Sequence, residues 1–305
     1  MKATTRSGVG ALALLAIWGT TLAATGSAWA AAPTLNQIVD SAPPGDWRDL
    51  DPSNLLVMTI PQGRVVIELA PRFAPNHVTN IKRLVAAGFF DGLSVVRAQD
   101  NYVAQWGDAE SARPTGEGRL RLGAEFDRPY APSEAFVALP DPDTYAAQTG
   151  FAGDFPAARD PKSGLTWLTH CYGMVGAGRA IDPDSGGGAE LYAVIGQAPR
   201  QLDRNVTLVG RVIEGMEYLA SLPRGHGEMG FYQTPPERIT IASVRLASEM
   251  PAAERPAFQA LRTDSATFAT LVQNRRFRRD DWYKVPAGRI DVCNVPLPVR
   301  RAPTK

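Results

Sequence analysis

Short β-rich runs, each ended by turn residues, dominate the middle of this sequence and most constrain its fold. The first two are LLVMTI (55–60) and RVVIEL (64–69), and Pro61-Gln62-Gly63 between them predicts a hairpin. Further β-like runs follow at Leu93–Val96, Tyr102–Gln105, Gly173–Val175, Leu191–Ile195, Thr207–Val209 and Arg238–Leu246. Many short strands with few helices between them favour a closed or nearly closed β architecture.

Two helical segments interrupt these runs. Pro75 suits the first turn of a helix, because the N–H that it lacks would have no partner there. Gly88 is a suitable C-cap for this helix, and apolar residues recur between them at helical spacing, at Val78, Ile81, Leu84 and Val85. A second, shorter helix is predicted over Gly215–Leu222.

The first 30 residues have the pattern of a secretory signal peptide. Lys2 and Arg6 precede an apolar run from Val9 to Trp18, and Ala28-Trp29-Ala30 has the form of a cleavage site. The run is shorter than the roughly 20 residues of a membrane span, and an uncleaved anchor is the alternative interpretation. We expect cleavage after Ala30 and export to the periplasm, with no membrane attachment afterwards. Secretion out of the cell is the alternative.

Composition narrows the class of protein. The 305 residues are 44% hydrophobic and 21% charged, which excludes wholesale disorder. The 32 Lys and Arg nearly balance the 31 Asp and Glu, so the net charge of +1 provides no broad surface for nucleic acid. The three histidines are scattered, and two cysteines are too few for a four-cysteine zinc site. We therefore expect no metal, no cofactor and no nucleic-acid partner.

The two cysteines, Cys171 and Cys293, lie far apart in the sequence. An even number of cysteines in an exported chain favours a disulfide, because the compartment is oxidising. Two buried free thiols are the alternative.

Three stretches fall outside the β pattern. Residues 31–53 are proline-rich and are interpreted as an arm over the surface. Residues 127–162 show no periodic pattern, are rich in Pro, Asp, Ala and Gly, and are interpreted as a long loop. Residues 248–305 are interpreted as an appendage tethered by the disulfide, with an extended tail. Its apolar residues fall at helical spacing, with Asp264 or Ser265 as a cap, at Phe258, Leu261, Phe268, Leu271 and Val272. The loop and the tail are also candidate surfaces for self-association.

The run FFDGLSVVRAQDNYVAQWGD (89–108) resembles the signature of the cyclophilins, roughly F-Y-D-G-x-x-F-H-R-V-x-x-x-F-x-x-Q-G-G-D. The resemblance continues in order through GMVGAG (173–178), GGAELYAVIG (187–196) and LDRNVTLVGRVIEGMEYL (202–219). The family has S-M-A-N-A-G, G-S-Q-F-F-I and W-L-D-G-x-x-x-V-F-G-x-V-x-x-G-M at these places. It implies a mostly β fold over residues 54–247, an eight-stranded antiparallel barrel capped by two helices. It also implies a peptidyl-prolyl cis-trans isomerase.

The resemblance assigns roles residue by residue. Arg97 matches the catalytic arginine, and Gln105 the glutamine beside it. Tyr102, Val103, Tyr192 and Leu202 match the walls of the proline pocket. Val175 and Gly176 fall on the segment whose backbone pairs with the bound peptide. The remaining expected contacts depart from the family pattern: Gln201 for an aromatic residue, Val206 for His and Glu190 for Gln.

The chemistry follows from the X-Pro bond itself. Its rotation barrier is about 18–20 kcal/mol, and twisting concentrates lone-pair density on the proline nitrogen. A guanidinium beside that nitrogen donates a hydrogen bond that stabilises the twisted state more than either planar state. No covalent step is required.

Two hypotheses result. The first is an exported prolyl isomerase that assists folding, which rests on Arg97, Gln105 and the pocket residues. The second is a cyclophilin-like module that binds proline-containing segments or a protein partner without catalysis, which rests on the departures at Gln201, Val206 and Glu190. Glu190 is expected either to hold Arg97 by an ion pair or to sequester it.

Overall fold

The computed structural model describes residues 32–108, 110 and 112–303, so the signal peptide predicted at residues 1–30 lies outside the described residues. Among the residues that are described, no helix combines the length and the apolar character needed to cross a membrane.

The predicted hairpin begins a nine-stranded antiparallel sheet. In sheet order its strands are β14 (Ile239–Thr240), β4 (Ser94–Ala98), β5 (Val103–Gly107), β12 (Glu190–Val194), β11 (Met174–Ala177), β13 (Leu208–Glu214), β3 (Gly63–Leu69), β2 (Leu55–Ile60) and β15 (Ser243–Leu246). The two edge strands, β14 and β15, are consecutive pieces of one segment, which pairs first with β4 and then with β2. This segment joins the two edges of the sheet, and the predicted eight-stranded barrel is confirmed when it counts as one strand.

Both predicted helices cover the barrel. Helix α2 (Pro75–Ala86) buries the apolar residues that the spacing placed on one face, and α3 (Met216–Ala220) buries Leu219 in the same core. Gly215 precedes α3 with a φ of +86°, and a Cβ there would lie 2.3 Å from the carbonyl oxygen of Arg64. Glycine is therefore the residue that fits this turn.

The segment 127–162, predicted to be a loop, contributes four strands of a five-stranded sheet. Its strands, in sheet order, are β6 (Arg128–Pro129), β10 (Leu165–Leu168), β9 (Phe155–Asp160), β8 (Gln148–Ala152) and β7 (Val137–Ala138). The loop prediction was wrong because β8 (QTGFA) and β9 (FPAARD) lack the local pattern that is typical of strands. Their only β-branched or aromatic residues are Thr149, Phe151 and Phe155. Their pairing with each other, and not their local propensity, makes them strands.

The arm is also more structured than predicted. Thr34 caps helix α1 (Leu35–Asp40), and β1 (Trp47–Asp49) pairs with β16 (Phe258–Leu261), which pairs in turn with β17 (Val299–Arg301). Trp47 is buried, so the arm is not a surface strap. Phe258 and Leu261 therefore lie in a strand, contrary to the helical spacing, because two residues three apart do not separate a helix from a half-buried strand.

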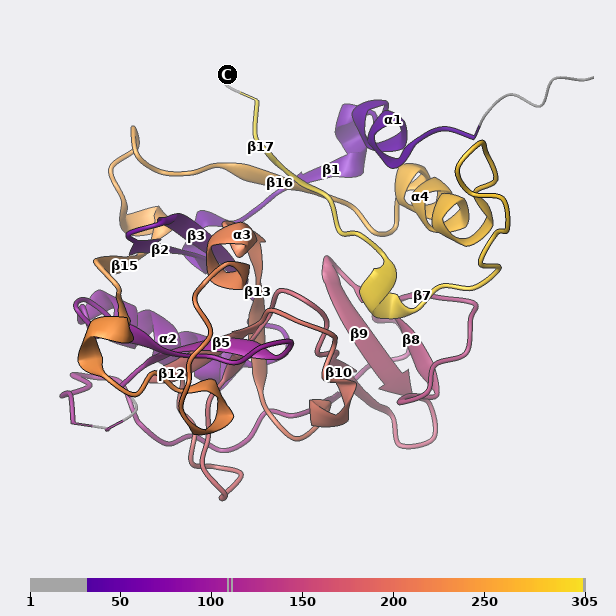
Figure 1. Cartoon of the computed structure of the whole chain (residues 1–305). Coiled ribbons are helices and arrows are strands. Elements are labelled where there is room, and N and C mark those ends of the chain that lie inside the picture. The colour runs from indigo at the N-terminus through magenta and orange to yellow at the C-terminus, as the bar shows by residue number, and fades with distance from the viewer. Residues whose placement is uncertain (1–31, 109, 111, 304–305) are drawn as a thin grey trace, which may run out of the picture. The chain divides into compact units, whose positions relative to one another are not determined.

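The helix expected after Ser265 is present as α4 (Ala266–Phe277), and the Ser265 hydroxyl accepts a hydrogen bond from the backbone N–H of Phe268 at 3.1 Å. Helices α1 and α4 lie side by side in Figure 1, near the insertion strands β7 and β8. Phe151 of β8 meets Phe268 of α4 edge to face, with ring centroids 5.0 Å apart.

Arm, insertion and C-terminal extension thus share one hydrophobic core, which also includes barrel residues such as Met174 and Leu208. The predicted disulfide is confirmed within this core. It joins Cys171, just before β11, to Cys293 in a short 3-10 turn (Val292–Asn294), with the two Cα atoms 4.9 Å apart.

Candidate active site

A cavity of about 640 Å³ opens beside strands β4, β5 and β12 of the barrel. The structure brings together eight of the eleven site residues predicted from the sequence on its walls: Arg97, Tyr102, Val103, Gln105, Glu190, Tyr192, Leu202 and Val206. The cavity therefore combines one guanidinium, one amide and one carboxylate with an apolar wall.

Three acceptors hold the Arg97 guanidinium in place. Its Nε donates to the carbonyl oxygen of Met229 at 2.7 Å, one Nη donates to Gln105 Oε1 at 3.1 Å, and the other Nη donates to the side-chain oxygen of Gln99. The rings of Tyr102 and Phe231 also lie 5.5 and 5.2 Å from its central carbon. Such a clamp fixes the plane of the guanidinium, so its remaining N–H groups have a set direction.

Burial lowers the pKa of Arg97, and the nearby Tyr102 partly offsets that shift. Arginine begins from so high a pKa that the guanidinium stays charged at neutral pH. The partial desolvation therefore leaves a cation whose remaining donors are less shielded by water.

Glu190 acts on Arg97 through Gln105. The Gln105 Nε2 donates to Glu190 Oε2 at 2.6 Å, while its Oε1 accepts from Arg97. The carboxylate thus fixes the amide with its oxygen toward the guanidinium. Neither direct ion pairing nor sequestration describes this arrangement, because Gln105 stands between the two charges.

The apolar wall includes Val103 and Tyr192, which pack with Val194 in one buried cluster, and Tyr102 and Val206 pack against that cluster. The Tyr192 hydroxyl turns away from solvent and meets Nε2 of the buried His170 at 2.9 Å. Burial raises the pKa of Tyr192, and the neighbouring Tyr102 and Asp203 raise it further, so the phenol remains protonated.

Three predicted residues lie outside the cavity. Val175 and Gly176 are in β11, an interior strand paired with both β12 and β13, and the cavity is bordered by Gly178, Arg179 and Ala180 instead. The register between β11 and β13 shifts between Val175 and Gly176. Gln201 is exposed and faces a separate cavity of about 450 Å³ that includes Tyr145 and Trp167.

Several functional contacts escaped the sequence reading. Met229 and Phe231, which clamp Arg97, come from the loop after α3, and Met229 adopts a φ of +53° that turns its carbonyl toward the guanidinium. The glycine-rich run RGHGEMG (224–230) indicates an irregular loop, but nothing in it indicates that the loop contacts Arg97. His170, one of the three scattered histidines, has no sequence motif that links it to the site, yet it contacts the Tyr192 hydroxyl.

Comparison with known families decides the identity of this site. The family model for "Cyclophilin type peptidyl-prolyl cis-trans isomerase/CLD" matches residues 55–246, which is the barrel from β2 to β15. The chain belongs to the cyclophilin family. It is a peptidyl-prolyl cis-trans isomerase, with the arm, the insertion and the extension added to the family's barrel.

Similar proteins agree with this assignment. Probable peptidyl-prolyl cis-trans isomerases from Brucella suis and Brucella abortus are 28% and 27% identical to the chain over 192 residues, which is 61% of this chain and 80% of each relative. The crystal structure of the cyclophilin AquaCyp293 from Hirschia baltica is similar with a TM-score of 0.68 and 28% identity. The match covers 85% of this chain and 95% of that one, so it extends beyond the barrel.

Gly176 lies outside the cavity but packs directly against Tyr192, one of the cavity's wall residues. A Cβ at this position would lie 2.3 Å from the Cζ and Oη atoms of Tyr192. We expect Gly176→Ala to displace the Tyr192 ring, to cost about 1–3 kcal/mol of stability by overpacking, and to raise the Kd of a proline peptide several-fold.

Nuclear magnetic resonance (NMR) titration and thermal unfolding would measure both effects. Gly123→Ala is the matched control, because a Cβ there meets nothing within 4 Å. Wild-type affinity in Gly176→Ala would show that the cavity does not depend on the position of Tyr192.

Proposed function

We propose that this cyclophilin isomerises X-Pro bonds in exported proteins and thereby assists their folding, with Arg97 as its catalytic residue. The observation that carries the proposal is the clamp on Arg97. Of the five N–H groups of a guanidinium, three are bound to Met229, Gln99 and Gln105, which leaves two for a substrate.

The mechanism is electrostatic stabilisation of the twisted bond. The proline ring occupies the apolar wall of Tyr102, Val103 and Tyr192, while the acyl side rotates. As the imide loses planarity, its nitrogen gains lone-pair density and accepts a hydrogen bond from Arg97. Because the clamp orients the guanidinium in advance, little reorganisation is needed at the moment of reaction. The chemistry needs no covalent step and no cofactor.

The compartment is part of the proposal. The signal-peptide pattern at residues 1–30 directs export, and the Cys171–Cys293 disulfide fits an oxidising compartment such as the periplasm. The expected substrates are exported proteins that fold in the periplasm.

The first experiment measures prolyl isomerisation by NMR exchange on a short Ala-Pro peptide, with the chain from residue 31 onward. We expect the enzyme to accelerate cis–trans exchange. Arg97→Ala is expected to lose this acceleration. Its matched control is Arg121→Ala, which removes a half-exposed arginine that pairs with Asp182 and Asp184 outside the cavity. Peptide shift changes without acceleration would favour the second hypothesis, a proline-binding module.

A second experiment tests export. The full chain is expressed in a Gram-negative host, the compartments are separated, and the intact mass of the protein is measured. We expect a periplasmic protein that begins at Ala31 and contains no free thiol. A cytoplasmic protein that retains residues 1–30 would refute this part of the proposal.

A further inference from the structure

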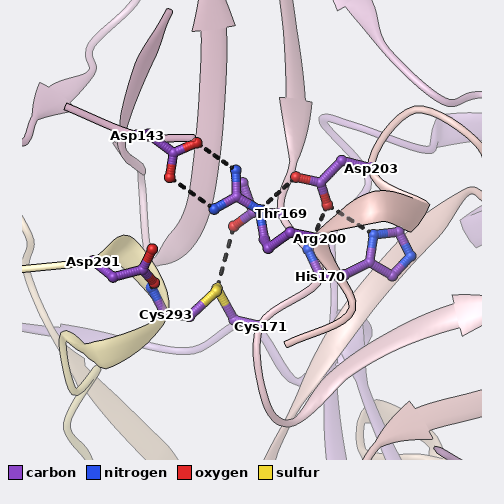
Figure 2. The surroundings of a disulfide bond; sticks show 8 residues. All are labelled: Asp143, Thr169, His170, Cys171, Arg200, Asp203, Asp291 and Cys293. Atoms are coloured by element: carbon purple, nitrogen blue, oxygen red, sulfur yellow. Dashed lines mark hydrogen bonds and ion pairs between the residues drawn. A yellow bond between two sulfur atoms is a disulfide. The ribbon is translucent and has the colours of Figure 1, made fainter. Parts of the chain in front are cut away.

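The wall of the proline cavity is connected to the insertion by an unbroken series of hydrogen bonds. The series begins at Tyr192 inside the barrel and ends at Asp143, between strands β7 and β8. Figure 2 shows its outer part, from Asp143 through Arg200 and Asp203 to His170, next to the disulfide.

Each link is short. The Tyr192 hydroxyl lies 2.9 Å from His170 Nε2, and His170 Nδ1 lies 3.0 Å from Asp203 Oδ1. Arg200 Nε donates to Asp203 Oδ2 at 2.6 Å, and its two Nη atoms donate to the two oxygens of Asp143 at 3.0 Å each.

The series is also almost completely buried. The side chain of His170 is 0% exposed, those of Arg200 and Asp143 are each 3% exposed, and that of Asp203 is 6% exposed. Hydrogen bonds in such surroundings are strong, and a missing partner is costly. The orientation of each group is therefore set by the next group in the series.

The chemistry gives the series a direction. Asp203 accepts from the backbone N–H of His170 at 2.8 Å and faces its Nδ1, so a neutral His170 carries its proton on Nδ1. Nε2 is then an acceptor, and the protonated Tyr192 hydroxyl donates to it. This bond holds the hydroxyl away from the cavity and leaves the ring as the cavity wall.

We propose that His170 is a positioning residue for substrate binding, and that Asp143 of the insertion acts on the proline cavity through Arg200, Asp203 and His170. The insertion is thereby a functional part of the enzyme, because it fixes the ring against which the proline packs. The inference rests on the proposed function and names residues that act on its site from outside it.

Two features argue against a purely structural role. Gly176 makes room for the Tyr192 hydroxyl end to reach His170, as shown by the 2.3 Å that would separate a Cβ from that hydroxyl. The insertion also has a second, partly buried bidentate pair, in which Asp141 binds Arg276 of α4 at 2.8 and 2.9 Å. That pair fastens the insertion to the extension and does not lead to the cavity.

The test is a double-mutant cycle with peptide affinity as the readout. We expect Asp143→Asn and Tyr192→Phe each to raise the Kd and KM of an Ala-Pro peptide about 3- to 10-fold with kcat nearly unchanged, because a binding wall holds planar and twisted states alike. The double variant is expected to lose no more affinity than the single variant with the larger loss, because Asp143 acts through the Tyr192 hydroxyl. Asp141→Asn is the matched control, and we expect it to lower thermal stability while the Kd stays at the wild-type value.

Fully additive losses in the double variant, or an equal Kd loss in Asp141→Asn, would overturn the inference. Titration by NMR shifts needs no catalysis, so an inactive wild type that binds peptide would refute the proposed function and still test the positioning. If Asp143→Asn fails to fold, Tyr192→Phe, which removes one oxygen, decides by its Kd. The ring NMR signals of His170 give a further check, since a neutral ring without a proton on Nδ1 contradicts the series.

Discussion

Replacing Arg97 with alanine is expected to lower kcat/KM for an Ala-Pro peptide by about 10²- to 10³-fold, the usual cost of losing one donor aimed at developing charge. The loss should fall mainly on kcat, because the guanidinium bonds to the proline nitrogen only as the bond twists. Peptide affinity should change little, since Tyr102, Val103 and Tyr192 still form the wall. Exchange NMR under saturating and subsaturating peptide separates the two parameters.

Arg97→Lys provides the sharper comparison. Lysine keeps the charge but has no planar fork, so it cannot bond to Met229, Gln99 and Gln105 and still present a fixed donor to the substrate. We expect this variant to be nearly as slow as Arg97→Ala. A lysine enzyme with close to wild-type kcat would show that charge alone suffices and that the clamp is dispensable.

Local patterns predicted the hairpin at 55–69 and helix α2. The barrel and the residues that line its cavity were predictable because four ordered blocks of the sequence resemble the cyclophilin motifs, and the resemblance assigned a residue of each block to the cavity. Gln201 faces away from the cavity for a physical reason. It lies in the 3-10 turn Arg200–Leu202, where Arg200 binds Asp143 of the insertion and Gln201 faces outward.

The remaining structure depends on contacts between distant residues. Asp49 of β1 and Gln259 of β16 meet across 210 residues of sequence, and no local pattern announces such a pair. The clamp on Arg97 similarly depends on the Met229 carbonyl, 132 residues away. A backbone carbonyl has no side-chain signature, so this contact follows only from the folded chain.

Removing the Cys171–Cys293 disulfide is expected to lower the free energy of unfolding by about 2–5 kcal/mol. The bond joins residues 122 positions apart, so without it the unfolded chain gains much conformational freedom. At roughly 2–4 °C per kcal/mol for a large domain, the Tm should fall clearly. The double variant Cys171→Ala, Cys293→Ala avoids leaving one reactive thiol.

Thermal unfolding of the wild type with and without dithiothreitol supplies the control. Reduction should lower the wild-type Tm to that of the double variant and leave the variant unchanged. We expect unfolding to remain a single transition, because Phe151, Phe268 and Met174 belong to one core shared by insertion, extension and barrel. Two separate transitions in the variant would show instead that the disulfide, and not this core, joins the extension to the barrel.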